Sequence, residues 1–483
     1  MSAGPRPGGR PASAARDTRG RRVLLVAGIL PVLYAVLVVL RACFARSAAG
    51  EAGGLYSTSF PPLLADVLSL AVYGLAIAAI VWPVGAIARL RRVRRGRRPR
   101  PVGAPHIVIV AALALPYALA TAEYAARYAP MLGICLPGTA FALCGLHWVQ
   151  RYRRMPVWML LAAFAWGLVI AFGYTVSVEF WAFTDIGQAI PPRTGSQLVA
   201  SMHSATVIML ACAGFFEELA KLVGVAILFI LFSRRLDGLV SGVVLGAAAG
   251  LGLNLAESFI NMGESAGAAA SQFWLRQCVG LMAAHTAFTA LSGAGIGLAQ
   301  QLRAPRAKLA AVACGLLAAS CGHFASDAIL AAESGWHIGS QEIAVLVVLP
   351  ALIVATQGPF IVMYVLLLRR GLRAQARGLA AVLGPEVGSG RGAITAAEAT
   401  VLLSPPLRFW ARVTALLRYG PAAWYQLGRL HAAQADLAMR RWRRTQGTLG
   451  GQDADDDGLR SRIRELRAHQ VVILASTGQQ VPA

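Results

Sequence analysis

The chain has 483 residues, of which 57% are hydrophobic and only 14% are charged. This composition excludes an ordinary soluble domain and predicts an all-α protein made mostly of membrane-spanning helices. The formal net charge of +23 is in the range of nucleic-acid-binding proteins, but the arginines gather at the edges of apolar runs instead of on one soluble face. We therefore expect a polytopic protein of the lipid bilayer, with no nucleic-acid partner.

About ten apolar runs are long enough to cross a bilayer. They lie near residues 23–40, 63–88, 106–127, 131–149, 157–178, 205–233, 239–260, 275–300, 308–331 and 343–368. The first run follows an arginine-rich start and is longer than the roughly 7–15 apolar residues of a signal peptide. We interpret it as a retained helix and predict a transmembrane bundle of about ten spans.

Basic residues follow every second run. The clusters are residues 89–100, Arg151 with Arg153 and Arg154, Arg234 with Arg235, Arg303 with Arg306 and Lys308, and Arg369 with Arg370 and Arg373. Because positive loops stay in the cytoplasm, this alternation places both termini there. The Ala- and Arg-rich composition is typical of a protein of the bacterial inner membrane.

Composition also divides the chain into segments. We predict a disordered basic N-terminus at 1–22, scaffold spans at 23–200, a catalytic core at 201–335, a last span at 336–370 and a cytoplasmic tail at 371–483. The tail contains a basic amphipathic stretch around Phe409 to Leu430, suited to a membrane surface. We favour a solvated tail, with a regulatory or trimming role, over a surface-bound one.

Ionisable and amide side chains within the apolar runs gather in four consecutive predicted helices. They are Glu217, Glu218 and Lys221, then Asn254 and Glu257, then His285, and finally His323 and Asp327. A charged group at membrane depth costs roughly 2.5–3.5 kcal/mol on insertion scales, so their retention indicates a function. At about 1.5 Å per residue, the groups lie about 22–28 Å from the cytoplasmic ends of their helices, and therefore at one level.

Spacing within the first of these helices separates two roles. Lys221 lies four residues after Glu217 and three after Glu218, so all three share one helical turn. One carboxylate can neutralise the lysine while its neighbour points about 100° away, toward a shared cavity. A structural and a chemical glutamate are therefore expected, and the sequence leaves open which is which.

His323 and Glu257 each have a polar residue within one helical turn. Asp327, four residues after His323, can accept a ring N–H and fix the tautomer that leaves the other nitrogen free for a metal or an oxyanion. Asn254 lies three residues before Glu257, within one turn. One histidine in a helix bundle is usually an interior residue, but two histidines with several carboxylates at one depth favour a site.

Four motifs carry these residues in order between about residues 205 and 330. They are Glu217-Glu218-x-x-Lys221, Asp237-Gly238-Leu-Val-x-Gly242 leading to Ala256-Glu257, His285 with small residues following to Gly293, and His323-x-x-x-Asp327. The set resembles the PrsW-type intramembrane proteases, relatives of the CAAX-prenyl protease and bacteriocin-processing group. The family usually has Asn where this chain has Ser258, and either Asn254 or Asn261 substitutes as the donor or this donor is absent.

The resemblance implies hydrolysis of a peptide bond in or near the membrane, with a membrane-anchored protein, such as an anti-sigma factor, as substrate. In the preferred hypothesis His285, His323 and Glu257 hold Zn²⁺, and Glu217 or Glu218 is the general base. The rival has no metal: a glutamate activates water and a histidine donates to the oxyanion.

Two hypotheses from other classes use the same side chains. A proton- or cation-coupled transporter would use them as a relay, but the sequence has no internal repeat of the kind that marks many transporters. A non-catalytic scaffold would only bind a membrane partner. Cleavage assays separate the protease from both.

Overall fold

The computed structural model describes residues 12–44, 63–94, 104–179, 196–264, 267–281, 283–333, 340–390, 393–446 and 454–476. Most of these residues form helices, and no strand occurs among them. The scaffold half contains α1 (Ala12–Ala27), α2 (Ile29–Phe44), α3 (Leu63–Arg94), α4 (Ala104–Arg127), α5 (Ala129–Trp148), α6 (Val157–Ala165) and the π-helical η2 (Trp166–Ala171). Of the predicted disordered N-terminus, residues 12–22 lie in α1, and residues 1–11 lie outside the described part.

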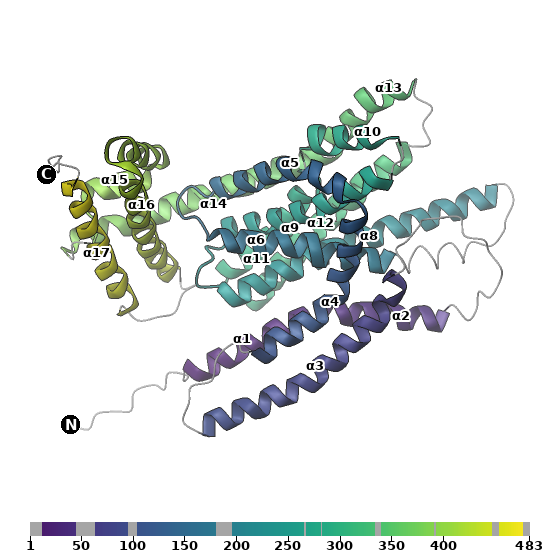
Figure 1. Cartoon of the computed structure of the whole chain (residues 1–483), viewed down its shortest axis with the longest axis horizontal. Coiled ribbons are helices and arrows are strands. Elements are labelled where there is room, and N and C mark those ends of the chain that lie inside the picture. Colours follow the sequence, from purple (N-terminus) through teal and green to yellow (C-terminus); the bar gives the residue numbers. More distant parts are fainter. Residues whose placement is uncertain are drawn as a thin grey trace.

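The second half supplies the remaining helices. They are α8 (Ser196–Phe232), α9 (Leu239–Glu264), α10 (Ala269–Phe273), η3 (Trp274–Val279), α11 (Ala283–Gln301), α12 (Pro305–Glu333), α13 (Gln341–Ile343), η4 (Ala344–Val348), α14 (Leu349–Gly388), α15 (Ala396–Leu403), α16 (Pro405–Thr445) and α17 (Ala454–Ser476). Figure 1 shows α5, α6, α9, α11, α12 and α14 running in roughly one direction as a bundle. The predicted polytopic all-α fold is confirmed.

Eight helical stretches among the described residues are long and apolar enough to cross a membrane, and a bent pair makes nine. The eight are Arg19–Val39, Ser69–Ala88, Ala104–Arg127, Ala129–Trp148, Val157–Glu179, Leu239–Glu264, Pro305–Leu330 and Gln341–Gly388. The predicted run 205–233 lies in α8, which carries three charged side chains in one turn and is not among these candidates. The described part of the chain therefore supplies eight or nine candidate spans, fewer than the predicted ten or so.

The predicted continuous helix over 275–300 is broken in the structure. Ala269–Val279 and Ala283–Gln301 meet at an angle of 45°. Leu281, at the break, has a φ of 46°, a left-handed backbone conformation that residues other than glycine rarely adopt. The break places the first turn of α11, rather than the middle of a long helix, at the depth where ionisable groups gather.

Helix α9 is the centre of the bundle. Its residues from Leu239 to Ala256 are all buried, and it packs most extensively against α11. Small residues make this approach possible: a Cβ at Gly246 would overlap the carbonyl oxygen of Thr289, and one at Gly250 would overlap that of His285. The close packing fixes the beginning of α11 beside the second half of α9.

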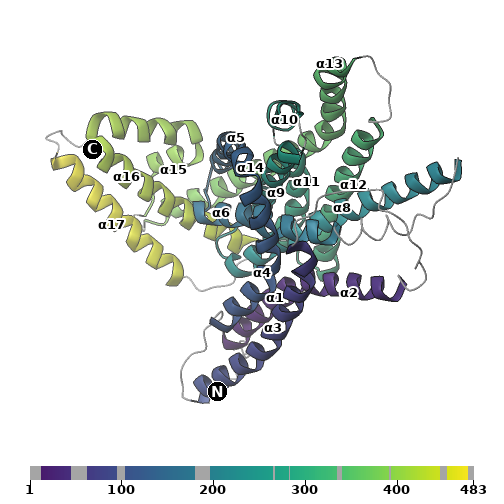
Figure 2. The ribbon, with the colours of Figure 1, turned by 45° about the vertical axis from the view of Figure 1, so that its right-hand side comes forward.

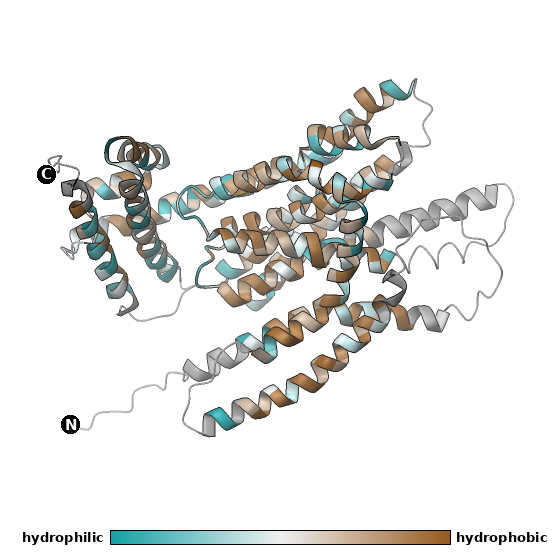
Figure 3. Cartoon of the chain, in the orientation of Figure 1, coloured by the Kyte–Doolittle hydropathy of each residue, from teal (hydrophilic) through white to brown (hydrophobic). Residues whose placement is uncertain are grey.

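The C-terminal helices form a packed unit at one end of the bundle (Figures 1 and 2). Helix α14 leads into it, and its own small core includes Leu383, Leu437, Trp442 and Ile463. Hydrophilic residues cover much of α16 and α17, whereas the bundle is largely hydrophobic (Figure 3). The predicted tail is thus a helical unit that contacts the bundle.

Candidate active site

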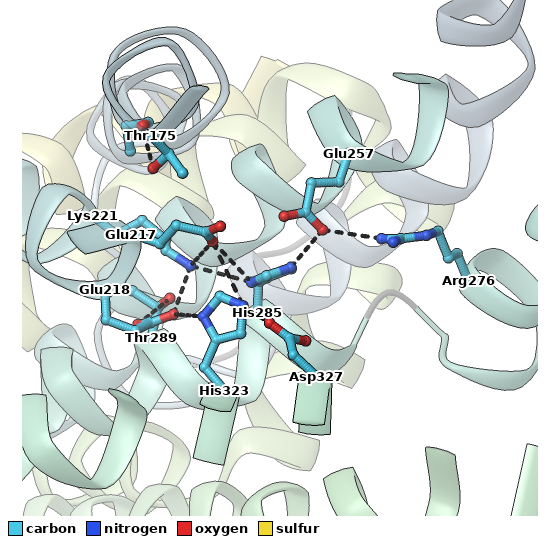
Figure 4. Close-up of polar contacts among 11 residues, drawn as sticks. Thr175, Glu217, Glu218, Lys221, Glu257, Arg276, His285, Thr289, His323 and Asp327 are labelled. Carbon is cyan, nitrogen blue, oxygen red and sulfur yellow. Dashed lines mark hydrogen bonds and ion pairs between the residues drawn. The ribbon is translucent and has the colours of Figure 1, made fainter. Parts of the chain in front are cut away.

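The charged turn of α8 is buried in the bundle. Lys221 and Glu218 are fully buried, and Glu217 is 4% exposed. Lys221 Nζ lies 2.6 Å from Glu218 Oε1 and 3.4 Å from Glu217 Oε2, the contacts that three- and four-residue spacing allows on a helix (Figure 4). The lysine therefore balances one of the two negative charges locally and helps to hold both side chains.

The two glutamates of this turn have different surroundings. Glu218 Oε1 accepts from Lys221, and its Oε2 accepts from the Thr289 hydroxyl at 2.9 Å. Glu217 Oε2 instead faces two imidazoles, 3.8 Å from His285 Nδ1 and 3.7 Å from His323 Nε2. Glu218 is therefore held on both oxygens, whereas Glu217 points toward the centre of the cluster.

Glu217, His285 and His323 form a group in which one potential ligand atom from each lies within 4.8 Å of the others. All three side chains are buried, and the two imidazole rings meet edge to face with centroids 4.6 Å apart. Phe288 stacks on the His323 ring at a centroid distance of 5.8 Å. Two imidazoles and one carboxylate are a donor set that suits a catalytic zinc ion.

Glu257 contacts the same cluster from the other side of His285. Its Oε2 lies 2.8 Å from His285 Nε2 and 3.0 Å from Arg276 Nη1 (Figure 4). Arg276 comes from η3 and His285 from α11, so the break between these helices brings both side chains to one carboxylate oxygen. Glu257 lies outside the compact group of Glu217 and the two histidines. That Glu257 is a zinc ligand therefore remains a prediction from the sequence.

Asp327 is the predicted partner of His323, and the two side chains are in contact. Asp327 Oδ2 lies 3.1 Å from His323 Nε2. The other ring nitrogen, Nδ1, is 3.6 Å from Glu218 Oε1 and is buried without a hydrogen-bond partner among the described residues. The nitrogen that faces Glu217 is therefore the one that Asp327 also contacts.

The asparagines do not reach the Glu257 carboxylate. Asn261 donates to the backbone carbonyl of Glu257, and the buried amide nitrogen of Asn254 has no partner among the described residues. Arg276 is the side chain that donates to the Glu257 carboxylate. Of the eight predicted site residues, the structure thus brings seven into one contact network and leaves Asn254 beside it.

Three residues of the network were not predicted. Thr289 follows His285 by four residues and so lies on the same helix face, a signal that the sequence contains. Arg276 is an arginine inside an apolar run, which by itself indicates a buried partner. Glu179 ends the span Val157–Glu179 and interacts electrostatically with Glu217.

Charge counting shows what the cluster can hold. Five carboxylates, from Glu179, Glu217, Glu218, Glu257 and Asp327, face two permanent cations, from Lys221 and Arg276. With all five ionised, three negative charges remain without a permanent counter-charge. Protonated histidines, a divalent cation or both would balance them, because a buried charge needs a partner.

Residues 155–355 match the family model of the PrsW family intramembrane metalloproteases. The matched segment begins just before α6 and ends in α14, so it contains all of the contact network, Arg276 and Glu179 included. No curated protein and no solved structure matches the chain. The match extends beyond the residues 205–330 that carry the motif resemblance, and the relationship to the CAAX-prenyl protease group stays a prediction.

Proposed function

We propose that this chain is an intramembrane metalloprotease that hydrolyses a peptide bond of a membrane-anchored protein, such as an anti-sigma factor, in the bacterial inner membrane. The observation that carries the proposal is the buried group of Glu217, His285 and His323, held by helices of a membrane bundle. The family match over residues 155–355 supports the same reaction class.

The residues fit a zinc ion in donor type and in charge. Glu217, His285 and His323 would hold it, and the uncompensated negative charge of the cluster favours a divalent cation there. A bound zinc ion would act as a Lewis acid on the scissile carbonyl. Glu257, which contacts His285 Nε2, can accept that ring proton and keep the Nδ1 lone pair directed toward Glu217.

Glu217 and Glu218 have different roles in this proposal. Both oxygens of Glu218 are engaged by Lys221 and Thr289, so we assign it a positioning role. Glu217 faces both imidazoles and takes part in the reaction, either as a metal ligand or as the acceptor of the proton of the attacking water.

One observation favours a metal-free form of the same reaction. Lys221 Nζ lies 3.2 Å from His285 Nδ1, the ring nitrogen that also faces Glu217, so a cation already occupies this side of the group. In this form Glu217 is the general base, and a protonated His323 donates to the oxyanion. Zinc content separates the two forms.

The test combines cleavage with metal analysis on the purified, reconstituted protein. Wild type is compared with Glu217→Gln, Glu257→Gln, His285→Ala and His323→Ala on a panel of single-pass membrane substrates, with zinc measured per chain. Glu123→Gln, in α4 and outside the network, is the matched carboxylate control.

We expect cleavage by wild type and by the control, and loss of cleavage in the histidine variants and in Glu217→Gln. Zinc lost in Glu217→Gln but retained in Glu257→Gln makes Glu217 the ligand, and the reverse makes Glu257 the ligand. Cleavage without zinc supports the metal-free form. No cleavage by well-folded wild type would contradict the proposal and point to transport or scaffolding.

A further inference from the structure

A second cluster of polar side chains lies at the opposite end of α9 from the candidate active site. Glu257 follows Leu239 by eighteen residues in α9, roughly 27 Å along the helix. Near the Leu239 end, the loop between α5 and α6 faces α16 across a cavity of about 910 Å³. We call this cavity the arginine pocket, because Arg151, Arg154, Arg235, Arg408 and Arg412 line it beside the aromatic side chains of Trp148 and Trp424.

Among the described residues, one acidic side chain lines the arginine pocket, and it already has a partner. Asp436 Oδ1 accepts from Arg153 Nε at 2.5 Å, and Arg153 also donates to Asp237 at 2.6 Å. Among the described residues, the lining arginines Arg151, Arg154, Arg235, Arg408 and Arg412 form no ion pair with a carboxylate. The pocket therefore carries an excess of positive charge.

Arg408 and Arg412 hold their guanidinium groups in the pocket through neutral acceptors. Arg408 donates to the carbonyl oxygens of Tyr152 and Arg151, and Arg412 donates to that of Gly428. The Nε of each arginine is buried without a partner among the described residues. Buried donors of this kind indicate an acceptor that the protein itself does not supply.

The pKa values of His431 and Arg408 are lowered, as the excess of positive charge in the pocket requires. Burial, Arg412 and Arg408 lower the pKa of His431 to about 3, so this side chain is neutral at physiological pH. Burial, Arg412 and Arg154 lower the pKa of Arg408 to about 10. An anion in the pocket would relieve both effects, since an opposite charge favours the protonated form of each group.

The position of the pocket indicates where such an anion comes from. Trp148 is the last residue of α5, and Pro156 is the N-cap of α6, so the pocket lies where two candidate spans leave the membrane. Tryptophan and arginine are typical of this interfacial layer. Arg154 also stacks over the Trp148 ring, at 4.6 Å from its centroid.

Helix α16 extends the same layer. It runs across the direction of the spanning helices at the end of the bundle (Figure 1). Its first half exposes Phe409, Trp410 and Leu417, the last at 79%. Gly420, with a φ of 82°, ends this half and lets the chain turn before α16 continues. Exposed aromatic and aliphatic side chains beside a basic pocket suit contact with lipid.

We propose that the arginine pocket binds the phosphate-bearing headgroup of an anionic phospholipid. Arg408 and Arg412 hold the phosphate, and Trp148 and Trp424 flank the headgroup. The acyl chains follow the exposed apolar side chains of α6, including Trp158 and Leu161. A lipid in this position contacts both the α5–α6 loop and α16, and so fastens the C-terminal unit to the membrane bundle.

Native mass spectrometry of the full chain in detergent tests this proposal with phosphatidylglycerol and phosphatidylcholine as probes. Wild type is expected to bind one phosphatidylglycerol in preference to phosphatidylcholine. Arg408→Gln/Arg412→Gln is expected to weaken that binding about thirtyfold, since each arginine near a lipid surface contributes roughly fivefold. The matched control is Arg303→Gln/Arg306→Gln, which removes two exposed arginines outside the pocket.

The exposed Arg154→Glu variant provides a second test should the double variant fail to fold, and it is expected to reduce phosphatidylglycerol binding as well. Equal binding of the two lipids by wild type would overturn the proposal. So would wild-type lipid preference in the folded double variant. Competition by millimolar inorganic phosphate, without any lipid preference, would assign the pocket to a soluble phosphate ligand and overturn the lipid assignment.

Discussion

Glu257 Oε2 lies 2.8 Å from His285 Nε2, while the other nitrogen of the same ring lies 3.8 Å from Glu217 Oε2. The imidazole of His285 is thus placed between two carboxylates from different helices. One ring nitrogen can donate while the other presents its lone pair, and this arrangement supports our proposal that Glu257 orients the ring and Glu217 takes part in the reaction.

The first prediction separates these two roles. Glu257→Gln is expected to reduce cleavage about 10- to 100-fold, as loss of an outer carboxylate does at metal-bound histidines, whereas Glu217→Gln abolishes it. Initial rates on one membrane substrate, at equal amounts of folded protein, provide the measurement. Equal residual activity in the two variants would contradict the division.

A second prediction concerns the buried lysine. Lys221→Met leaves Glu218 without its cation and is expected to lower the free energy of unfolding by about 3–5 kcal/mol. Adding Glu218→Gln removes the stranded charge and should restore part of that loss. Thermal unfolding in detergent measures both variants, and a destabilisation that Glu218→Gln only increases would argue against the pairing.

Close helix packing leads to a third prediction. Gly250→Ala places a Cβ against the carbonyl oxygen of His285 and is expected to destabilise the protein by about 1–3 kcal/mol and to reduce activity. Gly145→Ala is the matched control, because open space surrounds that position in α5. The control should be neutral or stabilising by about 0.5–1 kcal/mol. Similar unfolding temperatures for the two variants would be evidence against tight α9–α11 packing.

The fourth prediction uses the pH dependence of the C-terminal unit. His431 has a folded-state pKa of about 3 against an ordinary value of 6.5, so the unfolded chain binds its proton first as pH falls. Stability is therefore fully present above pH 6.5 and is lost toward pH 3, by at most about 1.4 kcal/mol per pH unit. His431→Gln should remove this part of the slope in chemical unfolding at several pH values. An unchanged slope would mean that His431 titrates normally.

The site could be predicted where one helix carries the whole pattern. Glu217, Glu218 and Lys221 share a turn, and His323 and Asp327 are four residues apart, so helical spacing alone places each set on one face. These side chains are in contact in the structure.

Contacts that depend on the rotation of one helix against another were not predictable in the same way. The contact of Arg276 with Glu257 depends on the break around Leu281, which interrupts an apolar run with no proline to mark it. The docking of α16 on the α5–α6 loop rests on Arg153, Asp237 and Asp436, which lie far apart in the sequence. The sequence pattern predicted the amphipathic stretch that lies in α16, but it did not predict that this helix packs on the α5–α6 loop.

Cleavage of a single-pass membrane protein by the full chain in liposomes, with the product termini identified by mass spectrometry, tests the central claim most directly. We predict that wild type cuts at a defined peptide bond in or near the membrane and that Glu217→Gln, folded to the same extent, does not. Cleavage that persists in Glu217→Gln, or an intact substrate after incubation with folded wild type across the panel, would contradict it.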